Sequence, residues 1–189
     1  MSTAAAVWTV VLFLFGMFFL PGCSSFSSLP DVPLQSSYSF SRQGLLHYRV
    51  PVGWFDASRD SQFVSAEIWL VRNDYAATIT VAELVIDEEA RRGIDREGLQ
   101  RLAQLSLSLF LSNGSAVTLN PPEPVSLGGP ASYAYTAMKP ETGDTVRVVL
   151  LDTGRRVYEA TALVRGRSAS GVSSEAFSAQ RSFLKSLRW

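Results

Sequence analysis

From residue 45 onward, apolar and polar residues alternate in the way that is typical of β-strands with one covered face. Residues 45–50 form a short apolar run that ends at Pro51-Val52-Gly53-Trp54, and the alternation resumes over residues 62–72. An Asn-Asp pair then supplies a tight turn, and residues 75–86 return with side chains that favour the extended state. The pattern predicts a long antiparallel hairpin, and a shift in its apolar phase predicts a bulge near Glu83.

The next stretch changes to the spacing of a helix. Asp95 is the expected N-cap, Asn113-Gly114 is the expected C-cap, and residues 87–92 form a separate helical turn that Gly93 interrupts. Residues 105–111 also alternate as a strand would, but the run is long for a strand, and Leu, Gln, Arg and Ala favour helix. The helix is indicated by residues at helical spacing, namely Leu99, Leu102, Ala103, Ser106, Leu109 and Phe110.

The last third of the chain predicts a meander and a closing helix. Three prolines restrict residues 118–125 to an edge strand or a loop. Three strands follow, joined by hairpin turns, at residues 129–139, 144–152 and 155–165. A Ser/Gly linker then leads to a helix capped by Ser173 or Ser174, with one face made of Ala176, Gln180, Phe183, Leu184 and Leu187. This order predicts an α+β fold: an antiparallel β-sheet of about six strands packed between helices.

Several of these features occur together in one known group of proteins. A strand leads into Pro51-Val52-Gly53-Trp54, a hairpin and a helix follow, Gly128-Gly129 opens the meander, and residues 183–189 close the chain. This arrangement resembles the PsbP-like α/β/α sandwich, with the DcrB-like envelope lipoproteins as the closer bacterial relatives, and it covers roughly residues 45 to 189. The motifs carry over no catalytic residue. Because that group includes accessory subunits, the resemblance implies a non-enzymatic role without naming a ligand.

The N-terminus predicts export and lipid attachment. The apolar run over residues 7–20, of about 14 residues, is too short to cross a bilayer core of about 30 Å as a helix, but it suits a secretory signal. Leu20-Pro21-Gly22-Cys23 resembles the lipobox of bacterial lipoproteins, which implies a signal peptide over residues 1–22 and a fatty-acyl group such as palmitate on Cys23. The first six residues lack Lys and Arg, so an uncleaved anchor, or a cleaved signal that leaves a free Cys23, stays open.

The location and the tether follow from the next residues. Ser24 after the cysteine implies, by resemblance to Gram-negative sorting rules, anchoring in the outer membrane facing the periplasm; anchoring in the inner or cytoplasmic membrane is the alternative. Residues 23–44 are rich in Ser and contain Pro30 and Pro33, which predicts a flexible tether before a domain at residues 45–189. An open alternative is that some apolar residues of the tether dock on the domain, the candidates being Phe26, Leu29, Leu34, Tyr38 and Phe40.

Charge and cysteine content narrow the classes of partner. Lys plus Arg and Asp plus Glu number 17 each, so no overall field attracts nucleic acid or anionic lipid. With the one cysteine acylated, no disulfide framework is available, and stability must come from packing. We therefore expect no nucleic-acid partner.

No residue pattern indicates catalysis. His47 is the only histidine, so a Ser-His-Asp site would depend on it, and a histidine within a strand and without a partner motif is more often structural. No group of His, Cys, Asp or Glu has the spacing of a zinc or calcium site, and no cofactor is expected. Asp152-Thr153-Gly154 resembles the aspartic-protease motif, but one copy is present, and the tripeptide is also an ordinary turn between strands.

The sequence thus favours a lipid-anchored envelope protein that acts as a non-enzymatic binding or accessory module for an unidentified envelope protein. The alternatives are a carrier of a small apolar ligand, suggested by the Leu-rich residues 99–111, and a hydrolase. Aromatic and arginine side chains dominate interface energetics, although the arginines can equally form a solvated surface with ion pairs. The candidate contact residues are Trp54, Phe55, Trp69, Arg91 and Arg92.

Overall fold

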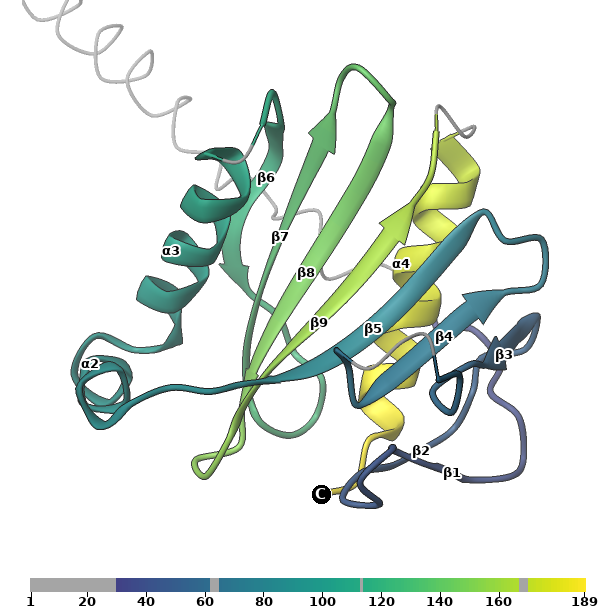
Figure 1. Cartoon of the computed structure of the whole chain (residues 1–189), viewed down its shortest axis with the longest axis horizontal. Coiled ribbons are helices and arrows are strands. Elements are labelled where there is room, and N and C mark those ends of the chain that lie inside the picture. Colours follow the sequence, from purple (N-terminus) through teal and green to yellow (C-terminus); the bar gives the residue numbers. More distant parts are fainter. Residues whose placement is uncertain (1–29, 62–64, 113, 167–169) are drawn as a thin grey trace, which may run out of the picture.

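The computed structural model describes residues 30–61, 65–112, 114–166 and 170–189 (Figure 1). Its centre is a seven-stranded antiparallel sheet in the order β3-β4-β5-β9-β8-β7-β6, and β1 and β2 form a separate two-stranded ribbon. The described strands are β1 (Ser39–Phe40), β2 (His47–Tyr48), β3 (Trp54–Asp56), β4 (Ile68–Arg72), β5 (Ala77–Leu84), β6 (Val117–Pro124), β7 (Ala131–Lys139), β8 (Asp144–Asp152) and β9 (Val157–Val164). The described helices are α2 (Glu88–Glu97), α3 (Leu99–Ser112) and α4 (Ser170–Ser186).

Different helices cover the two faces of the sheet. Side chains alternate between the faces along each strand, so Arg147 of β8 points toward α4 while its neighbour Val148 packs on the side of α3. α4 packs on β9 and β5, whereas α3 packs on β6, β7 and β8 (Figure 1). We call these two sides the α4 face and the α3 face.

The larger hydrophobic core lies on the α4 face. Small residues of β9, Ala160 and Ala162, are fully buried there and let α4 approach the strands closely. Phe183 of α4 is also fully buried, and its ring meets that of Tyr48 edge-on with centroids 5.5 Å apart. The ribbon therefore belongs to the same core as the sheet, because β2 contributes Tyr48 to it.

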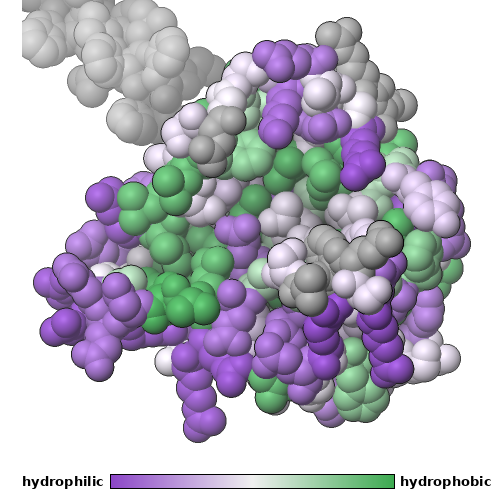
Figure 2. Space-filling model, viewed as in Figure 1, coloured by the Kyte–Doolittle hydropathy of each residue, from purple (hydrophilic) through white to green (hydrophobic). Residues whose placement is uncertain are grey.

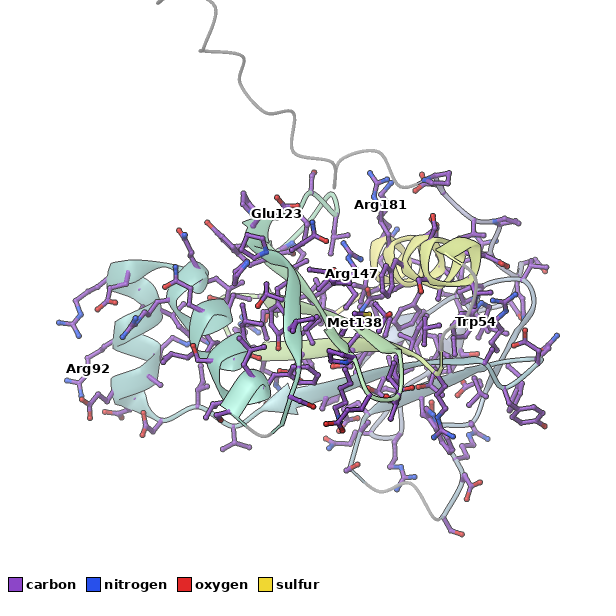
Figure 3. All side chains as sticks on the ribbon, turned by 90° about the horizontal axis from the view of Figure 1, so that it is seen from above. Trp54, Arg92, Glu123, Met138, Arg147 and Arg181 are labelled. Carbon is purple, nitrogen blue, oxygen red and sulfur yellow. The ribbon has the colours of Figure 1, made fainter. Side chains whose placement is uncertain are left out.

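A buried arginine lies between the sheet and α4 (Figure 3). Arg147 is 1% exposed, and its Nη1 donates to Gln180 Oε1 at 2.9 Å. Gln180 Nε2 in turn donates to the main-chain oxygens of Ala160, at 2.8 Å, and of Arg147, at 3.2 Å. Burial, followed by the charge of Arg181, lowers the pKa of Arg147 to about 10. One polar side chain on α4 thus joins two neighbouring strands.

The predicted fold class is confirmed: an antiparallel sheet lies between helices in an α+β arrangement, with seven strands instead of about six. The segment with three prolines was expected to be an edge strand or a loop, and it forms the edge strand β6. Its register with β7 shifts between Thr118 and Asn120 and again between Asn120 and Glu123. Prolines cannot donate to a ladder, which explains why this strand lies at the edge.

The first predicted strand is placed differently. Within residues 45–50 only His47–Tyr48 forms a strand, and it pairs with β1 in the ribbon and not with the main sheet. The edge strand next to β4 is instead β3, which begins at Trp54, the residue predicted to end a strand. Residues 62–64 lie outside the described part, and β4 begins at Ile68.

The predicted bulge near Glu83 is wrong. β5 pairs with β9 in continuous register from Ala77 to Leu84. The apolar phase shifts because the two faces of this strand meet different layers: Ile79 packs in the core of the α4 face, whereas Leu84 packs with α2 and α3 on the other face. A change of covering layer produces the same sequence pattern as an inserted residue.

The helix boundaries also differ from the prediction. α2 begins after Asp87, whose Oδ1 accepts from the Ala90 amide at 2.7 Å, and it continues through Gly93. Gly98, with a φ of +78°, ends α2 and separates it from α3, so Asp95 is not an N-cap. α4 begins at Ser170, before the predicted caps. Asn113 of the predicted C-cap lies outside the described residues.

The described part of the predicted tether lies against the domain. The Val32 amide donates to Ser182 Oγ of α4 at 2.8 Å, and the Gln35 amide donates to the Val50 carbonyl at 2.8 Å. Lys185 Nζ lies 2.9 Å from Asp31 Oδ1, and its hydrogen bond holds the pKa of Asp31 below the usual range. Residues 31–35 therefore contact the domain. Of the apolar residues named as candidates for docking, Leu34 bridges Pro51, Tyr38 and Phe40 are about half exposed, and Phe26 and Leu29 lie outside the described residues.

Within the described residues, no helix has both the length and the apolar character that crossing a membrane would require. The lipobox with Cys23 lies outside the described part.

The core of the α4 face predicts a large contrast between two phenylalanines. Phe183→Ala removes a fully buried ring and should lower the free energy of unfolding by about 3–5 kcal/mol. Phe40→Ala removes a ring that is 52% exposed and should change the free energy of unfolding by less than about 0.5 kcal/mol. Urea unfolding followed by circular dichroism measures both, and similar losses in the two variants would contradict the assignment of the core.

Candidate functional site

The α3 face of the sheet is only half covered. α3 packs on β6, β7 and β8, and together with α2 it covers the ends of β5 and β9 at Leu84 and Val157. The rest of the α3 side of β4, β5 and β9 is left without a described helix (Figure 1). The side chains of this open half lie in cross-strand rows, with Trp69 opposite Thr80 and Thr80 opposite Thr161. The open half consists of the half-buried Trp69, Thr78, Thr80, Ala82, Glu159, Thr161 and Leu163, and of the buried Val71.

A polar network joins α3 to the edge of the open half. Ser106 Oγ of α3 lies 2.9 Å from the hydroxyl of Tyr135, and it donates to Glu159 Oε2 at 3.3 Å. Thr161 Oγ1 donates to Glu159 Oε1 at 3.4 Å. Burial, together with the negative charge of Glu159, raises the pKa of Tyr135 to about 12. The network holds the carboxylate at the boundary between α3 and the open strands.

The leucines of α3 divide into two sets. Leu99 and Ala103 are buried, and Leu107 and Phe110 pack against the strands, so the space beneath the helix is filled by the chain's own side chains. This filled space is where the ligand of the carrier alternative was expected. The outer side carries Leu105, 46% exposed, and Leu109, 65% exposed, one turn apart. Figure 2 shows hydrophobic residues gathered over α3.

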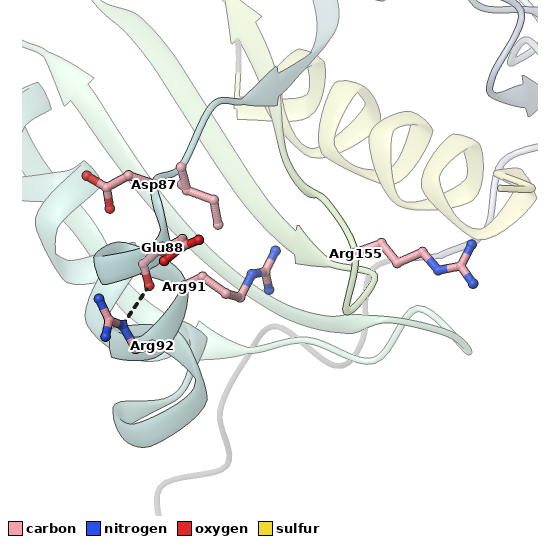
Figure 4. Close-up of a pocket in the computed structure, with 6 residues that line it drawn as sticks. Asp87, Glu88, Arg91, Arg92 and Arg155 are labelled. Atoms are coloured by element: carbon pink, nitrogen blue, oxygen red, sulfur yellow. Dashed lines mark hydrogen bonds between the residues drawn. The ribbon is translucent and has the colours of Figure 1, made fainter.

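The predicted arginines line a pocket of about 370 Å³ beside the first turn of α2 (Figure 4). Arg91 Nη1 lies 2.9 Å from Asp152 Oδ1 and 3.0 Å from Asp152 Oδ2, and Arg92 Nε donates to the Glu88 carbonyl at 3.3 Å. Arg155, from the β8–β9 turn, lines the other side. Because Asp87 and Glu88 also line the pocket and Asp152 neutralises Arg91, the pocket has mixed charge and no strong preference for anions.

The same ion pair explains the protease-like tripeptide. Asp152 Oδ1 accepts from the Gly154 amide at 2.8 Å, which closes the turn, and Gly154 has the positive φ of +80° that the turn requires. Both oxygens of Asp152 also face Arg91 of α2. The carboxylate therefore caps a turn and fixes α2 to β8.

The structure separates one of the three predicted aromatic contacts from the other two. Trp54 is 4% exposed and belongs to the core of the α4 face, so its side chain offers no surface. Trp69 is half-buried in the open half of the α3 face. Phe55 lies opposite Val71 on the edge strand β3, which places it on the same face of the sheet as Trp69. Phe55 is exposed, and its ring meets that of Tyr75 with centroids 5.9 Å apart.

His47 has structural contacts. Its main chain pairs with Arg188 through hydrogen bonds of 3.0 and 2.8 Å, and its ring meets Phe40 with centroids 4.5 Å apart. Among the described residues, no group of three His, Cys, Asp or Glu side chains could hold a metal ion.

Sequence reasoning missed the residues that join α3 to the sheet. Ser106, Tyr135 and Glu159 come from three elements, and only the register of β7, β8 and β9 places them together. A usable signal was the polar phase of residues 157–164, because Glu159 and Thr161 alternate with buried alanines. The sequence could not show which leucines of α3 are exposed, because leucines occur on all sides of this helix.

No protein-family model and no curated protein matches the sequence. Solved structures match in fold. The Ran-binding protein Mog1p of Saccharomyces cerevisiae is 14% identical, with a TM-score of 0.59 over 82% of this chain and 96% of that chain. A mutant of Mog1 is 13% identical, with a TM-score of 0.56 over 83% and 96%. The cyanobacterial PsbP of Synechocystis sp. PCC 6803 is 15% identical, with a TM-score of 0.49 over 89% and 98%. At such low identity, the likeness to the Mog1 structures shows a shared fold and nothing further.

The network under α3 predicts a specific dependence on alkaline pH. The raised pKa of Tyr135 means that the folded state favours the neutral phenol. The contribution of this group to the free energy of unfolding is therefore present below pH ~10 and is lost as pH rises toward ~12. The free energy of unfolding of the wild type should therefore fall between pH ~9 and ~11. For Tyr135→Phe this fall should be smaller by on the order of 1 kcal/mol. Urea unfolding at both pH values measures the difference, and equal losses in the two proteins would contradict the burial of this hydroxyl.

Proposed function

We propose that this protein is a lipid-anchored envelope protein whose domain acts as a non-enzymatic binding or accessory module. The observation that carries the binding role is the α3 face, where Leu105 and Leu109 are exposed on α3 and part of the sheet is left without a described helix. Exposed leucines one turn apart on a helix with a single charged residue, Arg101, offer apolar area that a partner can bury.

The composition of this surface favours a protein partner. Apolar side chains at its centre are the type that interfaces bury, and the threonines and Glu159 of the open half supply hydrogen-bonding groups at the rim. Trp69 adds an aromatic ring of the kind that dominates interface energies. The arginine pocket beside α2 extends the same side of the molecule with charges of both signs.

The fold comparison supports binding as a use of this architecture. The yeast protein with a similar fold is described as Ran-binding. That partner belongs to the yeast protein, and the likeness offers a precedent for a binding role of the fold. For this chain the proposed partner is a protein of the same envelope compartment.

The location rests on the sequence. Leu20-Pro21-Gly22-Cys23 supports acylation of Cys23, and Ser24 supports the outer membrane, with the periplasm as the compartment that the domain faces. The inner or cytoplasmic membrane is the alternative site of anchoring. No nucleic-acid partner and no cofactor are proposed.

The binding role can be tested by photo-crosslinking in intact cells. A photo-reactive amino acid at Leu109 or at Trp69 should give the same discrete adduct with an envelope protein, because both residues lie on the side of the sheet that α3 covers in part. Leu105→Ser should remove the adduct at Leu109 without lowering the free energy of unfolding by more than about 0.5 kcal/mol.

Val52 is the control position, because it is exposed in the turn before β3, away from α3. An adduct of equal yield from Val52, or none from Leu109 and Trp69, would contradict the proposal.

A further inference from the structure

The ribbon β1–β2 has one buried side and one exposed side. Along residues 45–50 exposure alternates strictly, so that Leu46, Tyr48 and Val50 are buried and the residues between them point outward. In β1, Phe40 points outward as well and is 52% exposed. We call this outward side the ribbon face; it consists of Tyr38, Phe40, Leu45, His47 and Arg49.

Arg188 extends the ribbon face. The main chain of Arg188 pairs with that of His47, which places Arg188 next to the ribbon as a further strand position. Trp189 follows it, about half exposed, with its ring 5.0 Å from that of Tyr158. Figure 1 shows the ribbon and the C-terminus at the lower side of the molecule, away from α3.

The two arginines of this surface have main-chain partners. Arg49 donates to the main-chain oxygens of Gln35 and Leu34, and Arg188 donates to those of Lys185 and Leu187. Carbonyl groups do not neutralise a guanidinium as a carboxylate would. Asp31 is engaged by Lys185, and Glu67 accepts from Gln43 in the loop between β1 and β2. Aromatic rings and two arginines without a carboxylate partner among the described residues thus share one surface.

The chain enters the domain at the same corner. Asp31 is tied to Lys185 near the end of α4, and the Arg49 amide donates to Ser186 Oγ at 3.0 Å, so the entry point and the ribbon are fixed to the same helix turn. Cys23 precedes Asp31 by eight residues. Eight residues cannot span more than about 29 Å even when fully extended. Acylated Cys23 would therefore hold this corner within that distance of the bilayer.

We propose that the ribbon face lies against the headgroup region of a membrane that contains anionic lipid. Tyr and Trp side chains are favoured at the membrane–water interface, and cations are attracted to anionic headgroups. A lipid on Cys23 anchors only the end of the tether, so a contact of this kind would set the orientation of the domain. This inference rests on the proposed acylation of Cys23.

The test uses the acylated full chain in vesicles of phosphatidylcholine with phosphatidylglycerol, with a photo-reactive amino acid at Phe40. The control is the same amino acid at Tyr75, an aromatic residue that is 70% exposed in the β4–β5 turn. Mass spectrometry should find lipid adducts at Phe40 and only background at Tyr75. Arg49→Gln with Arg188→Gln should lower the adduct yield at Phe40 by roughly fivefold or more.

Mass spectrometry also reports whether Cys23 carries lipid, which separates the two claims. Equal adduct yields at Phe40 and Tyr75 on an acylated chain would overturn the orientation and leave the lipid anchor standing. Adducts at Phe40 with a second copy of the chain, and not with lipid, would also overturn it. A chain without lipid on Cys23 would overturn both the anchor and the orientation.

Discussion

Gln180 and Arg147 set the packing of α4 on the sheet. The side-chain amide of Gln180 bonds to both β8 and β9. Its oxygen accepts from Arg147, and its nitrogen donates to the main chain of both strands. A buried guanidinium is costly to desolvate, so its position is fixed by the groups that satisfy it. α4 also holds the docked residues 31–35 and the ribbon. One helix therefore fixes the sheet, the chain entry and the C-terminus relative to one another.

This arrangement separates two surfaces. On the α3 face, the helix covers half of the sheet and leaves leucines, Trp69 and threonines accessible, which suits a protein partner. The ribbon face lies at the corner where the chain enters, and it carries aromatic and cationic side chains. In the proposed account, the second surface meets the membrane while the first stays free for binding.

Much of the fold could be predicted from periodicity, because the strands β7, β8 and β9 have regular alternation and are joined by turns with Gly. The helix boundaries could not be predicted, because both Asp87 and Asp95 are residues that favour the N-cap. The break between α2 and α3 lies at Gly98, which has a positive φ, and not at Gly93. The sequence of β5 could not show that Leu84 packs under α2 while Ile79 packs under α4.

The candidate site was less predictable than the fold. Trp54 and Trp69 were both predicted as partner contacts. Trp54 is buried in the core of the α4 face, whereas Trp69 lies in the open half, because the elements packed on each strand decide which of its faces is covered. The leucine-rich helix predicted apolar contacts but not which leucines would remain exposed. That division depends on which side of α3 packs on β6 and β7, which no local pattern specifies.

Hydrogen–deuterium exchange on the full-length protein, compared between detergent and anionic vesicles, tests most directly the claim that the two surfaces have different partners. We expect vesicles to slow exchange over residues 38–49 and to leave exchange in α3 unchanged. Slower exchange over α3, or no change over residues 38–49, would contradict it.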